Sequence, residues 1–161
     1  MNTNLLSATE EAALRTVITD SKNIIITCHK SPDGDAIGAS LAWAEYLYTL
    51  GKEPTIVAPD AFPDFLHWMP GTEKIVRYDK HTDKVEALFH DADLIFCLDF
   101  NSNDRVDEMK DTLDAATAKR VMIDHHLNPQ MDTLLTVSHP TMSSTCELVF
   151  RIITQLGGFE E

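Results

Sequence analysis

Three short segments of the chain carry side chains that bind divalent metals in proteins. The residues concerned are His29, Asp33, Asp35, Asp99, Asp124, His125 and His126. Carboxylate oxygens mixed with imidazole nitrogens favour Mn²⁺, Fe²⁺, Co²⁺ or Zn²⁺, whereas purely oxygen sites favour Mg²⁺ or Ca²⁺. Two metals ~3.5–4 Å apart can share a bridging carboxylate and hydroxide, and together stabilise the attacking and leaving oxygens of a phosphate ester. The residue types therefore predict a two-metal site for phosphoester hydrolysis.

Each of these segments follows an apolar, β-branched run that reads as a buried strand. The three runs cover residues 24–28, 93–100 and 120–126. In a parallel α/β sheet, ligands bind beyond the carboxyl ends of the strands, so these three segments should meet at one edge. The other expected strands are 54–59, 74–78 and 134–139, and the expected helices are 7–20, 36–50, 81–92, 104–118 and 143–156. This alternation predicts an α/β fold with a largely parallel sheet flanked by helices in three layers.

Local signals support several of these elements. The S-x-x-E pattern at residues 7–10 and again at 144–147 is typical of a capping box at a helix start. Gly51 is expected to end the second helix. Gly34 is expected to permit a sharp turn between the two aspartates beside it, and Gly38 to permit close approach in the first turn of the helix.

Each ligand candidate also has an ordinary structural interpretation. Asp33 and Asp35 could form a simple P-D-G-D turn. Asp99 could cap the helix that follows it. His125 and His126 could be a surface or core pair. The alignment of all three segments at predicted strand ends favours ligation over these alternatives.

The three segments in order resemble the motifs of the DHH phosphoesterase superfamily. HKSPDGDAIG resembles motif I, LDFN resembles motif II, and DHH at 124–126 is the motif that names the superfamily. With SSTCEL at 143–148, the chain is most similar to the NrnA-type oligoribonucleases and pAp-phosphatases, over roughly residues 22–156. The superfamily also includes the RecJ exonucleases and the family II inorganic pyrophosphatases.

The resemblance implies a role for each ligand candidate. It implies that His29 and Asp33 bind one metal, that Asp35 and His125 bind the other, and that Asp99 bridges the two. Two divalent cations are expected, with Mn²⁺ the first choice and Mg²⁺, Co²⁺ or Zn²⁺ as alternatives.

The resemblance also implies roles beyond the metals. Asp124 would orient its neighbours, and His126 would contact the scissile phosphate and stabilise its developing charge, so that both join Asp99 as catalytic residues. Asn101 and Arg105 follow motif II and are expected to bind substrate together with His126.

The sequence departs from the family pattern toward its end. The family's fourth aspartate motif and its glycine-rich substrate-binding domain have no counterpart before Glu161. We therefore expect residues 1–161 to be the metal-binding catalytic domain alone, incomplete at its C-terminus. A non-catalytic metal- or nucleotide-binding fragment is the alternative that this departure leaves open.

The net charge and the distribution of apolar residues limit the kinds of substrate and partner that we expect. A formal net charge of −13 repels long polyanions and disfavours duplex binding, which leaves a short oligonucleotide or a nucleotide phosphate as the expected substrate. No apolar run reaches the ~18–20 residues that cross a bilayer, and the acidic, polar start is not a secretory signal. A cytoplasmic protein without membrane contact is therefore expected. An incomplete domain would expose apolar surface, so a homodimer is a further expectation.

Two enzymatic readings fit these features. The first is Mn²⁺-dependent hydrolysis of phosphodiesters in short oligonucleotides and of phosphomonoesters such as pAp. The second is pyrophosphate or polyphosphate hydrolysis at the same site. The pyrophosphatase branch usually has serine at the position of Gly34, which weighs modestly against the second reading.

Overall fold

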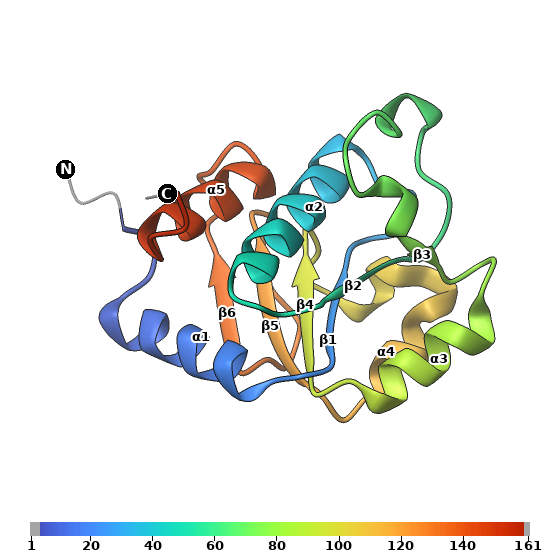
Figure 1. Cartoon of the computed structure of the whole chain (residues 1–161), viewed down its shortest axis with the longest axis horizontal. Helices are drawn as coiled ribbons and strands as arrows, with labels where there is room; N and C mark the ends of the chain where they lie inside the picture. The colour runs from blue at the N-terminus through green and yellow to red at the C-terminus, as the bar shows by residue number, and fades with distance from the viewer. Residues whose placement is uncertain (1–3, 160–161) are drawn as a thin grey trace.

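The fold is built on a six-stranded, all-parallel sheet, seen in a computed structural model that describes residues 4–159 (Figure 1). The spatial order of the strands is β3-β2-β1-β4-β5-β6. The strands are β1 (Ile24–Thr27), β2 (Thr55–Ala58), β3 (Val76–Arg77), β4 (Leu94–Leu98), β5 (Lys119–Asp124) and β6 (Leu135–Ser138). The predicted α/β class and parallel sheet are confirmed.

Helices cover both faces of this sheet. One face carries α1 (Ala8–Asp20), α2 (Gly34–Thr49) and α5 (Thr145–Gln155), and the other carries α3 (Thr82–Asp91) and α4 (Lys110–Ala115) (Figure 1). Alternate residues of β4 show why three layers form. Leu94 and Phe96 pack in the core on the α2 side, whereas Ile95 and Cys97 pack in the core on the α3 side. The central strands are apolar throughout because both of their faces are buried.

The helix starts follow the capping signals only in part. Ser7 and Glu10 form the full predicted capping box of α1, each side chain bonding the other residue's backbone N–H. At α5, the Ser144 hydroxyl accepts the Glu147 N–H, but the Glu147 carboxylate instead bonds the N–H and hydroxyl of Ser143. The second capping box is therefore only half formed.

Glycine positions give one confirmation and one correction. Gly51 follows α2 with a φ of 77°, as expected for a residue that ends a helix. Gly34 is the first helical residue of α2, and its φ is not positive, so the sharp-turn interpretation is wrong. The left-handed residue in this loop is instead Ser31, with a φ of 49°. A Cβ on Gly38 would stand 3.1 Å from the Cys146 sulfur, so Gly38 does permit close approach.

The segment after β4 differs most from expectation. A single helix over 104–118 is predicted, but the chain forms a 3₁₀ segment, η3 (Asn103–Met109), followed by the short α4. Asp107 has φ 51° and ψ −120° inside this stretch, which no helix accommodates. Its carboxylate lies 3.6 Å from the Lys30 ammonium, and the Lys30 N–H donates to the Arg105 carbonyl at 2.8 Å. Bonds to the motif I loop therefore accompany the break in the helix.

The strand order contains one topological switch point. From β1 the chain adds β2 and β3 on one side, then returns to add β4, β5 and β6 on the other. The loops after β1 and β4 consequently leave the sheet toward opposite faces. Such a point opens a crevice beyond the carboxyl ends of the two strands, and the fold places a binding site there by its topology alone.

Candidate metal centre

The predicted ligands lie at this switch point. His29 follows β1, Asp99 follows β4, and His125 follows β5. Asp33 and Asp35 stand at the N-terminus of α2, where Asp33 is the N-cap and accepts the Ala36 N–H at 2.9 Å. The structure therefore brings together all five residues that the sequence predicts as metal ligands.

Asp99 occupies the middle of the cluster. Its carboxylate reaches the His29 Nε2 at 3.2 Å through one oxygen and the His125 Nε2 at 3.6 Å through the other. The residue is 2% exposed, and it adopts a left-handed φ of 64° that costs an aspartate of order 1–3 kcal/mol. Asp99 is not a helix cap, since the N-cap of η3 is Ser102. The capping alternative for Asp99 is thus excluded.

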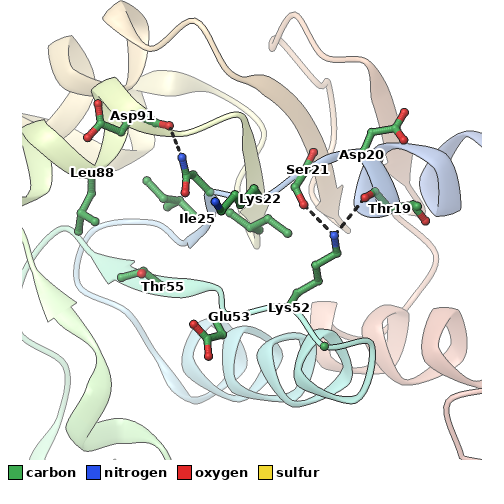
Figure 2. Close-up of a pocket in the computed structure, with 13 residues that line it drawn as sticks. Thr19, Asp20, Ser21, Lys22, Ile25, Lys52, Glu53, Thr55, Leu88 and Asp91 are labelled. Carbon is green, nitrogen blue, oxygen red and sulfur yellow. Dashed lines mark hydrogen bonds between the residues drawn. The ribbon is translucent and has the colours of Figure 1, made fainter.

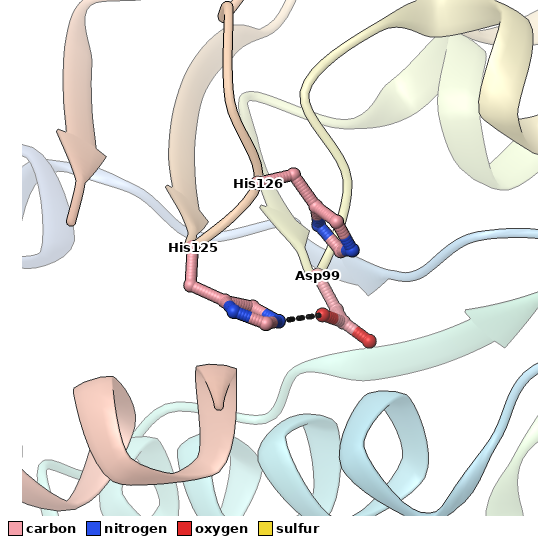
Figure 3. A group of neighbouring side chains, drawn as sticks. All are labelled: Asp99, His125 and His126. Atoms are coloured by element: carbon pink, nitrogen blue, oxygen red, sulfur yellow. Dashed lines mark ion pairs between the residues drawn. The ribbon is translucent and has the colours of Figure 1, made fainter. Parts of the chain in front are cut away.

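Two ligand groups share this carboxylate. Ligand atoms of His29, Asp33 and Asp99 lie within 4.8 Å of one another, and the same holds for Asp99, His125 and His126. Figure 3 shows the second group, in which both imidazole rings lie beside the Asp99 carboxylate. Two overlapping groups with a common member are the arrangement that a bridged pair of metals requires.

The second group includes His126, which is predicted from the sequence to contact the scissile phosphate rather than a metal. The His126 Nδ1 bonds the buried Asp124 carboxylate at 2.6 Å, and the His126 N–H donates to the same group at 3.1 Å. An ionised carboxylate only accepts hydrogen bonds, so Nδ1 carries the proton and Nε2 remains for a ligand. Asp124 therefore fixes the orientation of the imidazole and its tautomer, as in carboxylate–histidine pairs at metal sites.

Asp35 is held by the start of α5. Its two oxygens accept the N–H groups of Cys146 at 2.8 Å and Thr145 at 3.0 Å, and one of them lies 3.7 Å from the His125 Nε2. The Thr145 hydroxyl donates to Asp99 at 2.9 Å. The start of α5 thus contacts two of the ligands, although the sequence reading assigns no role to either Thr145 or Cys146. The only signal for them is their place within SSTCEL.

Replacing the Thr145 hydroxyl should loosen the centre. We expect Thr145→Val to weaken metal binding by about 10- to 100-fold, the cost typical of losing a hydrogen bond to a ligand. Thr145→Ser keeps the donor and should stay near the unaltered value. Calorimetric metal titration of both variants is the measurement, and equal affinities would show that the hydroxyl does not position Asp99.

The charges of the site fit divalent cations. Between residues 4 and 159, no lysine or arginine forms an ion pair with Asp33, Asp35, Asp99 or Asp124, and every ion pair of these carboxylates is with a histidine. Several carboxylates gathered in a crevice, two of them buried, are costly without positive charge. The mixed oxygen and nitrogen donors suit a borderline metal rather than Ca²⁺.

The ligand candidates differ in how tightly they bind protons. Hydrogen bonding to Asp99 raises the pKa of His29, and burial raises the pKa of Asp99 itself. Burial pushes the pKa of Asp35 upward, but the N–H groups of Cys146 and Thr145 outweigh it and leave that pKa lowered. Asp35 is therefore a carboxylate that is ready for a cation, whereas His29 must first lose its proton.

Metal affinity should consequently fall with acidity. Because the pKa of His29 is raised, we expect the loss to begin above the ordinary histidine value of about 6.5, with proton release on binding. Protonation of His29 adds to the free energy of unfolding of the metal-free chain below about pH 6.5. This added stability is lost as the pH rises through the raised pKa of His29. The gain in melting temperature on adding metal should therefore grow from pH 5.5 to pH 8. A gain independent of pH would contradict this assignment.

Two of the three predicted substrate residues, Asn101 and Arg105, lie outside the ligand groups. The Asn101 side chain donates to the Leu127 carbonyl at 2.8 Å and so ties down the loop after β5. Arg105 is exposed, and its carbonyl accepts the Lys30 N–H. The structure thus gives Asn101 a structural contact and leaves the Arg105 guanidinium in solvent, and substrate binding by either residue stays a prediction.

A hollow of about 640 Å³ lies at the other end of the sheet, beside the amino ends of β1 and β2 (Figure 2). Its Lys52 ammonium donates to the carbonyls of Thr19 at 3.1 Å and Ser21 at 2.8 Å, at the C-terminal end of α1. This lysine satisfies carbonyls at a helix end, and neither candidate metal group lies there. Among the described residues, both candidate metal groups therefore lie at the switch point rather than at this hollow.

Comparison with known proteins agrees with the geometry. Residues 23–161 match the sequence model of the DHH family, N-terminal domain. The chain belongs to the DHH family. A curated relative, the bifunctional oligoribonuclease and PAP phosphatase NrnA of Thermus thermophilus, is 34% identical in an alignment 145 positions long that covers 83% of this chain and 37% of the relative.

Two further relatives extend the comparison. The cyclic-di-AMP phosphodiesterase GdpP of Bacillus subtilis is 28% identical over 88% of this chain and 22% of its own length. The crystal structure of an exopolyphosphatase-related protein from Bacteroides fragilis superposes with a TM-score of 0.92 at 43% identity, covering 96% of this chain and 45% of that one. This DHH chain therefore spans less than half the length of these relatives, and NrnA and GdpP are named for the hydrolysis of phosphate esters.

Proposed function

We propose that this DHH chain forms the metal-binding half of a Mn²⁺-dependent phosphoesterase that cleaves short oligonucleotides and nucleotide phosphomonoesters such as pAp. The observation that carries the proposal is the pair of ligand groups that share Asp99 at the switch point. In this proposal His29 and Asp33 hold one ion, Asp35 and His125 hold the other, and Asp99 joins them. When bound, two such metals activate water and polarise the phosphate.

The remaining residues orient the reaction. Asp124 orients His126 through one hydrogen bond with the ring Nδ1 and one from the backbone N–H. A protonated His126 retains the bond from Nδ1 and gains a second N–H at Nε2, which can donate to a phosphate oxygen as charge develops there. Thr145 keeps Asp99 in place through its hydroxyl.

Charge and relatives together support the substrate class. The net charge of −13 disfavours long polyanions, and the two metals reverse the sign only locally. One relative is named as an oligoribonuclease and PAP phosphatase, and another as a cyclic-dinucleotide phosphodiesterase. We accordingly propose a short nucleotide substrate and a cytoplasmic location, without membrane attachment. Among residues 4–159 no helix is long and apolar enough to cross a membrane.

A substrate panel tests the proposal. The chain is incubated with Mn²⁺ and either a 5′-phosphorylated dinucleotide, pAp, pyrophosphate or polyphosphate, and the released nucleotide or phosphate is measured. We expect hydrolysis of the dinucleotide and of pAp, and its loss when a chelator removes the metal. Bound metals without turnover of any substrate would favour the non-catalytic alternative.

A second candidate is polyphosphate or pyrophosphate hydrolysis. It is favoured by the structural relative named as exopolyphosphatase-related, at 43% identity. The same metal centre would serve, because a phosphoanhydride needs the same activated water and charge stabilisation. Faster release of phosphate from polyphosphate than from pAp in the panel would select this candidate instead.

A further inference from the structure

Two large aromatic side chains stand in solvent in the loop between β2 and β3. Phe65 is 74% exposed and Trp68 is 77% exposed. Within the same turn, Leu66 is buried and Met69 packs against the core. Both pairs have i,i+3 spacing, which places their members on one side of a 3₁₀ turn. The turn therefore has two apolar sides. The aliphatic side chains pack against the core, and the aromatic side chains face solvent.

The loop that carries this aromatic pair, Phe65 and Trp68, contacts the first turn of α2 and the motif I loop. Leu66 Cδ2 is 3.8 Å from the place that a Cβ on Gly34 would occupy, and Gly34 separates two of the proposed metal ligands. The loop after β2 also meets the motif I loop, because the Asp60 carboxylate accepts the Ser31 N–H at 2.6 Å. Figure 1 shows the green loop beside the first turns of α2, where the ligands Asp33 and Asp35 are placed.

The loop is held in one shape by its own contacts. The Phe62 and His67 rings stack with centroids 4.7 Å apart. The Thr72 hydroxyl donates to the Met69 carbonyl at 2.9 Å and lies 3.2 Å from the His67 carbonyl. These contacts hold the segment that carries Phe65 and Trp68, which lowers the cost of ordering that segment when a ligand binds.

We propose that the aromatic pair is a stacking surface for the base of a nucleotide whose phosphate lies at the metal centre. This inference rests on the proposed function and deepens it by separating nucleotides from inorganic phosphates. Every nucleobase has a π-face that stacks on an aromatic side chain, whereas pyrophosphate and polyphosphate have none. In a chain of net charge −13, such uncharged contacts add attraction for a nucleotide that the overall charge does not oppose.

The two tryptophans provide a direct readout. Trp43 is fully buried and Trp68 is exposed, so acrylamide in solution can quench the fluorescence of Trp68 but not that of Trp43. The chain with Mn²⁺ is titrated with AMP and, separately, with ribose 5-phosphate, which has the same phosphate and sugar without a base. We expect AMP to protect Trp68 from acrylamide and ribose 5-phosphate to leave it accessible.

Variants measured by calorimetry complete the test. Trp68→Ala and Phe65→Ala should each weaken AMP binding by about 5- to 150-fold, the range found for removing one stacking partner, and leave ribose 5-phosphate binding unchanged. Phe150→Ala is the matched control, because Phe150 is 59% exposed and its ring packs against Phe159 instead.

The outcomes separate this inference from the proposed function. Binding of both ligands with equal affinity and no protection of Trp68 would overturn the stacking surface and leave the phosphoesterase proposal standing. Protection of Trp68 that grows with protein concentration in the absence of nucleotide would mean that a second copy covers the pair, and would also overturn it. Failure of both ligands to bind in the presence of Mn²⁺ would contradict the proposed function itself.

Discussion

Replacing Asp99 by asparagine should remove both metals from the centre at once. Asp99 is the member common to the two ligand groups, and its two oxygens face His29 and His125 separately. Asparagine keeps the size of the side chain but supplies one weaker oxygen ligand and no charge. We expect the affinity for each metal to fall by more than about 100-fold, beyond the cost of losing a supporting hydrogen bond. Calorimetric Mn²⁺ titration measures both sites together.

The control for this prediction is the replacement of a histidine that lies outside the candidate metal centre. His90→Ala removes an exposed imidazole of α3 whose ion pair is with Asp91, and it should leave the titration unchanged. Asp33→Asn is the informative comparison, because Asp33 belongs to one ligand group only and its loss should weaken one metal more than the other. Loss of a single metal in Asp99→Asn would show that Asp99 does not bridge.

Replacing His126 by alanine should abolish most turnover while the metals stay. Its Nδ1 is engaged by Asp124, which leaves Nε2 to meet either a phosphate oxygen or a metal. If Nε2 serves the phosphate, removing one such donor lowers kcat by about 10²- to 10³-fold. We expect this loss in hydrolysis of the dinucleotide, with two metals still bound in the titration.

The proximity of His126 to Asp99 and His125 makes this variant decisive for its role. A titration in which His126→Ala binds one metal fewer would make His126 a ligand and would leave the phosphate without its assigned donor. Turnover within a factor of two of the unaltered chain would rule out both roles.

Much of this arrangement could be predicted from sequence because strand ends in a parallel sheet converge. The apolar runs before His29, Asp99 and Asp124 are buried on both faces, and such runs are visible in a single sequence. Once the runs are read as parallel strands, the meeting of three distant segments follows from geometry. The family resemblance then supplied an expected role for each side chain.

Other features depended on contacts between segments that carry no local signal. The break in the predicted helix over 104–118 accompanies bonds from the motif I loop to Arg105 and Asp107, 75 and more residues away. The hold of Thr145 on Asp99 spans 46 residues, and its sequence shows only the start of a helix. The sequence indicates a turn at Gly34, but the residue with the left-handed conformation is Ser31. Serine has no particular preference for that conformation, so the sequence carries no signal for it. The spacing of apolar residues predicts which side chains are buried, but it does not predict the hydrogen-bond partner of a polar side chain.

The most direct test of the account is the electron paramagnetic resonance spectrum of the chain with two equivalents of Mn²⁺. If two ions share the Asp99 carboxylate, the spectrum should be that of a spin-coupled pair and should disappear in Asp99→Asn. The six-line spectrum of isolated Mn²⁺ ions at full loading would mean that the ions do not share a ligand, and the shared-carboxylate centre would be wrong.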